Sequence, residues 1–132
     1  MSLTSESNRC FVCGPGNPIG LGVTFRLEAQ TCVAEFTPDD RHMGYEGVTH
    51  GGILFSLLDD VMANWLWLQG IHCFTARADV RFRIPLPIGT PVRLESHCVK
   101  KKGRLVLMEG KVWRADSADL VAEASGSFIT RA

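Results

Sequence analysis

The chain has 132 residues, of which 45% are hydrophobic and 21% are charged, so we expect one globular domain over residues 1–132 that buries its own core. Its 14 basic and 14 acidic residues cancel, which excludes a general electrostatic attraction to nucleic acid or to an anionic membrane. Residues 1–9 are polar and lack the apolar segment of a secretion signal, so we expect a cytoplasmic protein.

Residues 1–20 are predicted to be irregular because glycine and proline recur in them. Cys10 and Cys13 have the spacing of a zinc knuckle, but a structural zinc site needs a second pair of ligands, and the other cysteines and the histidines show no matching spacing. We therefore expect no metal. The five cysteines are expected to be free thiols or small buried hydrophobic residues, and not a disulfide framework.

Two strands are predicted next, over residues 21–28 and 32–37, joined by a few residues as in a hairpin. The segment that follows, residues 38–49, is a long polar loop that contains glycine. Loops of this kind often carry function.

The helix predicted over residues 53–68 is almost wholly apolar, yet it contains two adjacent carboxylates, Asp59 and Asp60. A buried carboxylate is costly unless it is paired or used in chemistry. At about 100° per residue, Asp59 shares a face with Gly52 and Ser56, whereas Asp60 turns toward Asn64. The apolar positions cover most of the circumference, which predicts a helix enclosed by other structure. Its length of about 16 residues and its aspartates argue against a membrane span.

After the helix, apolar and charged side chains alternate from Asp79 to Ile84, as in a strand packed on one face. Pro85 and Pro87 are expected to end this strand. Three more strands are predicted over residues 92–100, 105–114 and 120–130. The order of two strands, one helix and four strands predicts an α+β fold, with an antiparallel meander that curls around one central helix.

This element order is joined by distinctive motifs: Gly-Tyr-Glu-Gly-Val-Thr-His-Gly-Gly at residues 44–52, Leu-Leu-Asp-Asp at 57–60, the opening segment from Cys10 to Cys13 with residues 17–21, and the strand over 75–87. Together they resemble the hotdog-fold acyl-CoA thioesterases, in particular the phenylacetyl-CoA thioesterase-like branch. The resemblance covers nearly the whole chain. It implies a hotdog fold, a curved antiparallel sheet of about six strands around one long helix, and a homodimer or a dimer of dimers.

The resemblance also implies a thioester hydrolase that releases a free acid and CoA, with no cofactor because CoA is part of the substrate. In the family, the aspartate nine positions after the histidine is the general base or nucleophile, and Asp59 holds that position relative to His50. The Gly51-Gly52 region of the family supplies backbone N–H donors to the thioester carbonyl. Some relatives have asparagine or glutamine where this chain has Gly44, so His50 and the backbone amides are the expected polarising groups.

Thioester hydrolysis needs an activated nucleophile and donors aimed at the oxyanion. Unpaired N–H groups at the helix start, with the positive end of its dipole, supply such donors at Gly51 and Gly52. Asp59 and Gly52 are seven residues apart, or about 10 Å along the helix axis, so one carbonyl cannot readily engage both. We therefore expect each site to combine the aspartate of one chain with the amides of another in a two-fold dimer.

Other residues are expected to bind the acyl-CoA substrate. These candidates are Gly44, Tyr45, Gly47, Thr75, Arg77, Arg81 and Arg83. Some relatives place a hydroxyl that helps the water near the position of Thr75, although strand propensity also explains this residue. The basic run over residues 100–104 either contacts CoA phosphates or is a charged hairpin tip.

Simpler roles and other functions stay open. Asp59 is alternatively a satisfied polar residue, Asp60 and Asn64 a hydrogen-bonded pair, and His50 a residue that only holds the loop. A hotdog-fold enoyl-CoA hydratase or dehydratase is a second candidate function. A non-catalytic acyl-CoA binding protein is the third, suggested by Gly44.

Overall fold

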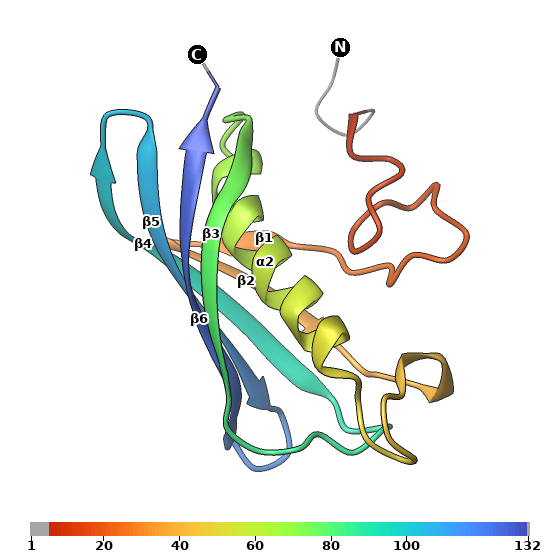
Figure 1. The fold of residues 1–132 in the computed structure, drawn as a ribbon. Helices are drawn as coiled ribbons and strands as arrows, with labels where there is room; N and C mark the ends of the chain where they lie inside the picture. The colour runs from red at the N-terminus through yellow and green to blue at the C-terminus, as the bar shows by residue number, and fades with distance from the viewer. Residues whose placement is uncertain (1–5, 132) are drawn as a thin grey trace.

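The computed structural model describes residues 6–131. The elements within that range, in chain order, are β1 (Arg26–Glu28), β2 (Thr31–Phe36), η1 (Asp40–His42), α2 (Gly51–Trp67), β3 (Cys73–Phe82), β4 (Val92–Lys102), β5 (Leu105–Arg114) and β6 (Leu120–Thr130). The six strands form one antiparallel sheet in the order β1-β2-β4-β5-β6-β3. The sheet curves, and α2 lies on its concave face (Figure 1). This is the α+β arrangement predicted from the sequence.

Helix α2 begins two residues before its predicted start because His50 caps it. The backbone of His50 is extended, and its Nδ1 accepts a hydrogen bond of 2.8 Å from the N–H of Gly52. The helix ends at Trp67, and the chain turns at Gly70, whose φ of +81° is accessible to glycine without steric cost. Local hydrogen bonds and backbone geometry therefore define both ends of α2.

One side of α2 packs against the concave face of the sheet. Its most deeply buried residues are Leu57, Leu58, Val61, Met62 and Leu66. Each large apolar side chain buried in this way contributes roughly 1.5–3 kcal/mol relative to exposure. Two side-chain hydrogen bonds add directional ties, from Ser96 Oγ to the carbonyl of Val61 at 2.6 Å and from Trp65 Nε1 to the carbonyl of Gln30 at 2.9 Å.

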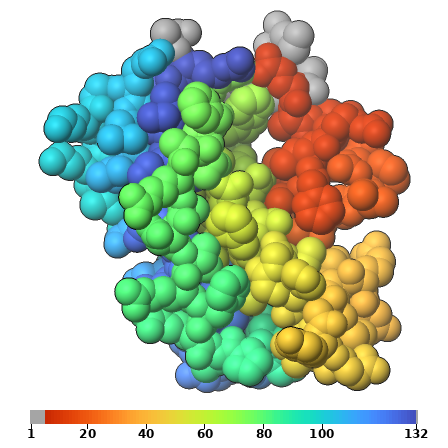
Figure 2. Space-filling view, viewed as in Figure 1, coloured from red at the N-terminus to blue at the C-terminus, as the bar shows by residue number. Residues whose placement is uncertain are grey.

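The other side of α2 lies open within the single chain, so the prediction of an enclosed helix is wrong for this face. Phe55 of α2 is 39% exposed, and Phe82 of the neighbouring β3 is 54% exposed. Figure 2 shows the surface of α2 between β3 and the N-terminal segment. Because β3 is the edge strand of the sheet, no further strand within residues 6–131 extends over this face.

Two predicted strands are wrong in extent. Residues 21–25 are not part of the sheet; instead the N–H groups of Leu21 and Val23 donate to carbonyls of the N-terminal segment at 2.8 and 2.9 Å. Strand β3 ends at Phe82 and not at Pro87, since Arg83 and Ile84 both direct their N–H groups to the carbonyl of Val121. In both segments these hydrogen bonds take the place of the regular hydrogen bonds between strands of the sheet.

The predicted meander is confirmed for β4, β5 and β6 but is wrong for β3. Strand β3 pairs with β6, with Thr75 opposite Phe128, and β4 pairs with β2. In chain order α2 follows β2 and precedes β3. The helix crosses the concave face of the sheet, so β3 joins the edge opposite β1 (Figure 1). This crossover places β3 beside the open face of α2.

The N-terminal segment runs along the flank of α2 (Figure 1). Together with residues 21–25, which precede β1, it contributes Val12, Val23 and Phe25 to the hydrophobic core. Residues 1–5, part of the polar start considered above, lie outside the described residues. Among residues 6–131, no helix is both long enough and apolar enough to cross a membrane.

Candidate active site

The loop before α2 is held in place by His50. The backbone N–H of His50 donates to the carbonyl of His42 at 2.8 Å, and its ring Nδ1 accepts from the N–H of Gly52. A ring nitrogen that accepts a hydrogen bond carries no proton. His50 is thus a helix cap, and its Nδ1 is already occupied.

This cap distinguishes the two predicted glycine donors. The N–H of Gly52 is taken by His50 Nδ1, and the N–H of Ile53 donates to the carbonyl of His50 at 3.0 Å. Within residues 6–131, nothing accepts from the N–H of Gly51. At the N-terminus of a helix, such a free N–H attracts negative charge. Gly51 is therefore the available donor of the pair.

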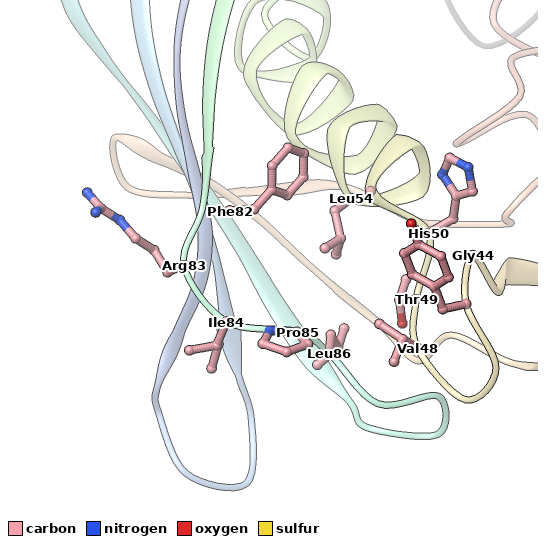
Figure 3. Close-up of a pocket in the computed structure, with 12 residues that line it drawn as sticks. Gly44, Val48, Thr49, His50, Leu54, Phe82, Arg83, Ile84, Pro85 and Leu86 are labelled. Atoms are coloured by element: carbon pink, nitrogen blue, oxygen red, sulfur yellow. The ribbon is translucent and has the colours of Figure 1, made fainter.

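A pocket of about 660 Å³ opens beside Gly51. Its apolar wall includes Leu54, Phe82 and Leu86, and Figure 3 shows the ring of Phe82 directed toward α2. A Cβ atom at Gly51 would lie 3.6 Å from that ring, which is ordinary contact. The free N–H of Gly51 therefore borders a largely apolar cavity.

Three of the predicted substrate-binding residues, Gly44, Tyr45 and Arg83, line this pocket. Tyr45 is 87% exposed, so it lies at the rim. Arg83 points away from α2 (Figure 3) and pairs with Glu123 at 2.7 Å. Gly47 is not among the lining residues, and its φ of +77° gives it a role in turning the loop.

Thr49, which belongs to the 44–52 motif but has no predicted role of its own, is a polar residue of this pocket. It is buried, and its Oγ1 finds no hydrogen-bond partner within the described part of the chain. A buried hydroxyl without a partner costs free energy, so a bound molecule that hydrogen-bonds to it is favoured. A threonine beside His50 carries no local signal of this kind, because its isolation depends on the packed loop.

Asp59 lies about two turns further along α2 and meets β3. The hydroxyl of Thr75 donates a hydrogen bond of 2.6 Å to Asp59 Oδ1. A bulge in β3 between Thr75 and Arg77 shifts the register with β6, and such bulges re-aim side chains. Asp59 Oδ2 accepts no hydrogen bond from residues 6–131, so one carboxylate oxygen is fixed and the other is available.

The neighbouring carboxylate of Asp60 is directed elsewhere. Asn64 Nδ2 donates to Asp60 Oδ2 at 3.1 Å, which confirms the angular prediction that Asp60 turns toward Asn64. Burial raises the pKa of Asp60 above its usual range, and the Asp59 carboxylate adds to this shift. The two adjacent aspartates therefore have separate surroundings.

Arg77 and Arg81 lie neither in the pocket beside Gly51 nor at the Asp59–Thr75 pair. Arg77 is exposed and pairs with Asp79 at 3.4 Å, and Arg81 lines a different pocket with Glu109 and other residues of β5 and β6. The bulge explains the difference, because it changes the alternation of side chains along β3. Thr75 consequently faces α2 while these arginines do not.

Comparison with known proteins identifies the family. The Thioesterase superfamily matches residues 46–121, which is more than half of the chain, so the chain belongs to this superfamily. The acyl-coenzyme A thioesterase THEM4 of Xenopus laevis is 32% identical over 98 residues, which cover 74% of this chain and 44% of that protein. The chain spans about half the length of the curated relatives it matches.

Solved structures show the same fold. A crystal structure of a thioesterase superfamily protein has a TM-score of 0.86 at 23% identity, covering 98% of this chain and 68% of that chain. The Escherichia coli PaaI protein from the phenylacetic acid degradation operon has a TM-score of 0.78 at 18% identity, covering 85% and 81%. A Streptococcus pneumoniae thioesterase protein with coenzyme A has a TM-score of 0.76 at 15% identity, covering 83% and 85%. The predicted hotdog fold is thereby confirmed.

Proposed function

We propose that this chain is an acyl-CoA thioesterase, in which Asp59 is the base or nucleophile and the Gly51 N–H is the oxyanion donor. One observation carries the proposal: a helix with a free N–H at its start holds, on its open face, a carboxylate that Thr75 fixes by one oxygen. The name of the THEM4 relative and the coenzyme A in the Streptococcus pneumoniae structure support the substrate class.

Each site is proposed to combine two chains. Gly51 and Asp59 are eight residues apart on α2, or about 12 Å along its axis, which is too far for one carbonyl to engage both. Two antiparallel copies of α2 about a two-fold axis would bring Gly51 of one chain to Asp59 of its partner. The open face of α2 and the exposed Phe55 and Phe74 support a homodimer, and the dimer can pair again into a tetramer.

The edge strand supports the same assembly. Among the strands of residues 6–131, β3 pairs with β6 on one side only, so its other side presents backbone groups that this part of the chain leaves unpaired. Such an edge is a template for pairing with another chain. Pairing of two copies of β3 would extend the sheet and cover the open face of α2.

In the proposed reaction, the carbonyl oxygen of the thioester accepts a hydrogen bond from Gly51 N–H. Asp59 Oδ2 removes a proton from water, whose oxygen attacks the carbonyl carbon, or the carboxylate itself attacks and water then cleaves the resulting anhydride. The tetrahedral oxyanion is stabilised by Gly51 N–H and the helix dipole. Its collapse breaks the C–S bond, and the CoA thiolate takes up the proton that Asp59 removed from water, or a proton from solvent on the anhydride route. The products are a free acid and CoA.

The acyl group is proposed to lie in the pocket beside Gly51. The apolar wall of Leu54, Phe82 and Leu86 suits a hydrocarbon or aromatic group, and the unpartnered hydroxyl of Thr49 offers one hydrogen bond. The PaaI neighbour makes phenylacetyl-CoA the first substrate to examine. The reaction as written needs no cofactor, and we propose a cytoplasmic location.

A thiol-release assay over a panel of phenylacetyl-, acetyl-, octanoyl- and palmitoyl-CoA tests the proposal. We expect release of CoA thiol from at least one substrate, and loss of that release in Asp59→Asn. Hydration of an enoyl-CoA without thiol release would show a hydratase instead. A rise in Tm with acyl-CoA but no turnover would show a binding protein. Either outcome would refute the thioesterase assignment.

A further inference from the structure

A second cluster of chemically active side chains lies where the N-terminal segment meets α2. The sulfur atoms of Cys10 and Cys13 and a carboxylate oxygen of Asp60 all lie within 4.8 Å of one another. Cys10 Sγ is 3.7 and 3.8 Å from the two carboxylate oxygens. The thioesterase proposal uses none of these three residues.

The turn that holds the two cysteines is tightly built. The N–H of Cys13 donates to Cys10 Sγ at 3.4 Å, and the N–H of Gly14 donates to the carbonyl of Cys10 at 2.9 Å. A Cβ atom at Gly14 would lie 2.4 Å from the backbone nitrogen of Cys10, so only glycine fits there. A backbone N–H directed at a sulfur fixes its orientation, as outer partners of metal ligands do.

The spacing between Cys10 Sγ and the Asp60 carboxylate suits a tetrahedral metal ion. With metal–sulfur and metal–oxygen bonds of about 2.3 and 2.0 Å, neighbouring sulfur and oxygen ligands of zinc lie about 3.5 Å apart. The observed separations of 3.7 and 3.8 Å are close to this value. Two thiolates select a soft ion such as Zn²⁺ over Mg²⁺ or Ca²⁺.

The surroundings also favour a cation. Cys10, Cys13 and Asp60, which become three anionic groups when both thiols are deprotonated, line one half-buried pocket. A divalent ion offsets this accumulation of negative charge. Asn64 Nδ2 holds Asp60 Oδ2 at 3.1 Å, as outer partners of metal-binding carboxylates do. The pocket, lined also by Cys73, leaves room for a fourth ligand.

We propose that Cys10, Cys13 and Asp60 bind one Zn²⁺ ion, which fastens the N-terminal segment to α2. The ion is structural in this proposal: it would join the turn that carries Val12 to the residue next to Asp59. The expectation of no metal rested on the missing second pair of cysteines or histidines. The third ligand is instead an aspartate on a distant helix, which spacing along the sequence does not reveal.

Zinc content tests this proposal without reference to activity. The full chain is purified under reducing conditions, given equimolar ZnSO₄, dialysed against metal-free buffer, and analysed by inductively coupled plasma mass spectrometry. We expect about one zinc per chain in the wild type. Cys98→Ser, which changes a half-buried cysteine outside the cluster, is the matched control and should keep its zinc. Cys13→Ser and Asp60→Asn should lose most of it.

Two further measurements keep the test decisive if a variant folds poorly. Titration of the metal-free wild type with Co²⁺ should give the thiolate-to-cobalt charge-transfer absorption, and EDTA should lower the wild-type Tm by about 5 °C. A wild type that retains no zinc and shows no charge-transfer band would overturn the proposal. The same zinc content in Cys13→Ser and Cys98→Ser would also overturn it.

Discussion

Thr75 Oγ1 donates a hydrogen bond of 2.6 Å to Asp59 Oδ1, which joins β3 to α2 on the open face of the helix. The two residues are far apart in the sequence, and the bulge in β3 accounts for the direction of the threonine. The bond fixes one oxygen of the carboxylate and leaves the other available. This arrangement is what the proposed base or nucleophile needs.

Replacement of Asp59 should abolish turnover and leave the fold intact. Asp59→Asn keeps an oxygen that accepts the Thr75 hydrogen bond but is neither a base nor a nucleophile, so we expect kcat to fall by about 10³-fold. Thiol release with the best substrate of the panel measures this loss, and circular dichroism checks the fold. A variant that keeps more than about a tenth of wild-type kcat would be inconsistent with an essential carboxylate.

Thr75 should act through Asp59, so its hydroxyl matters more than its shape. Thr75→Ser keeps a donor at the same place and should stay within about threefold of wild-type kcat, whereas Thr75→Val keeps the shape and should lose about tenfold or more. Comparison of kcat for the two variants checks this. Equal activity in Thr75→Val and wild type would mean that the bond has no catalytic role.

Substitution of Gly51 should lower kcat with little effect on stability, whereas substitution of Gly52 should mainly lower stability. Gly51 is the first residue of α2 and follows an extended His50, a position where proline is well tolerated. Gly51→Pro deletes the free N–H, so kcat should fall by about 10²-fold or more with little change in Tm. Thiol release and thermal unfolding measure the two quantities.

Gly52→Ala is the matched variant. Its Cβ would lie 3.0 Å from His50 Nδ1, so it should disturb the cap and lower the free energy of unfolding by about 1 kcal/mol. Its Tm should therefore fall more than that of Gly51→Pro. The reverse ranking in kcat, with Gly52→Ala more impaired than Gly51→Pro, would contradict the choice of Gly51 as the donor.

The thiol of Cys73 should be slow to alkylate. Burial raises its pKa to about 11, and the carboxylates of Asp59 and Asp60 add to the shift. A raised pKa keeps the thiol protonated, and the thiolate is the reactive form. The rate of reaction with iodoacetamide, followed by peptide mass spectrometry, should therefore rise about tenfold per pH unit from pH 8 to about pH 10. A rate that levels off by pH 9 would exclude this shift.

Local patterns were enough to predict the central helix and the divergence of its two aspartates. Both depend on the fixed angle between successive helical residues, and Asp60 does turn to Asn64. The start of α2 was predicted only to within two residues, because the cap by His50 places Gly51 and Gly52 inside the helix.

The other features of the fold and site depend on contacts between residues far apart in the sequence or on single side-chain conformations. The pairing of β3 with β6 and the open face of α2 depend on how the chain crosses the sheet, which strand periodicity does not encode. The cap formed by His50 Nδ1, which takes the N–H of Gly52, depends on one side-chain conformation. The approach of Asp60 to Cys10 depends on an irregular segment without periodic structure.

The central claim is that Asp59 and Gly51 of different chains form one site, and complementation tests it most directly. Asp59→Asn and Gly51→Pro chains with different affinity tags are co-expressed, and the mixed dimer is purified through both tags. One of its two sites then has both native groups, so we predict about half of the wild-type thiol release per dimer. Activity no higher than that of the two parent variants would contradict a shared site.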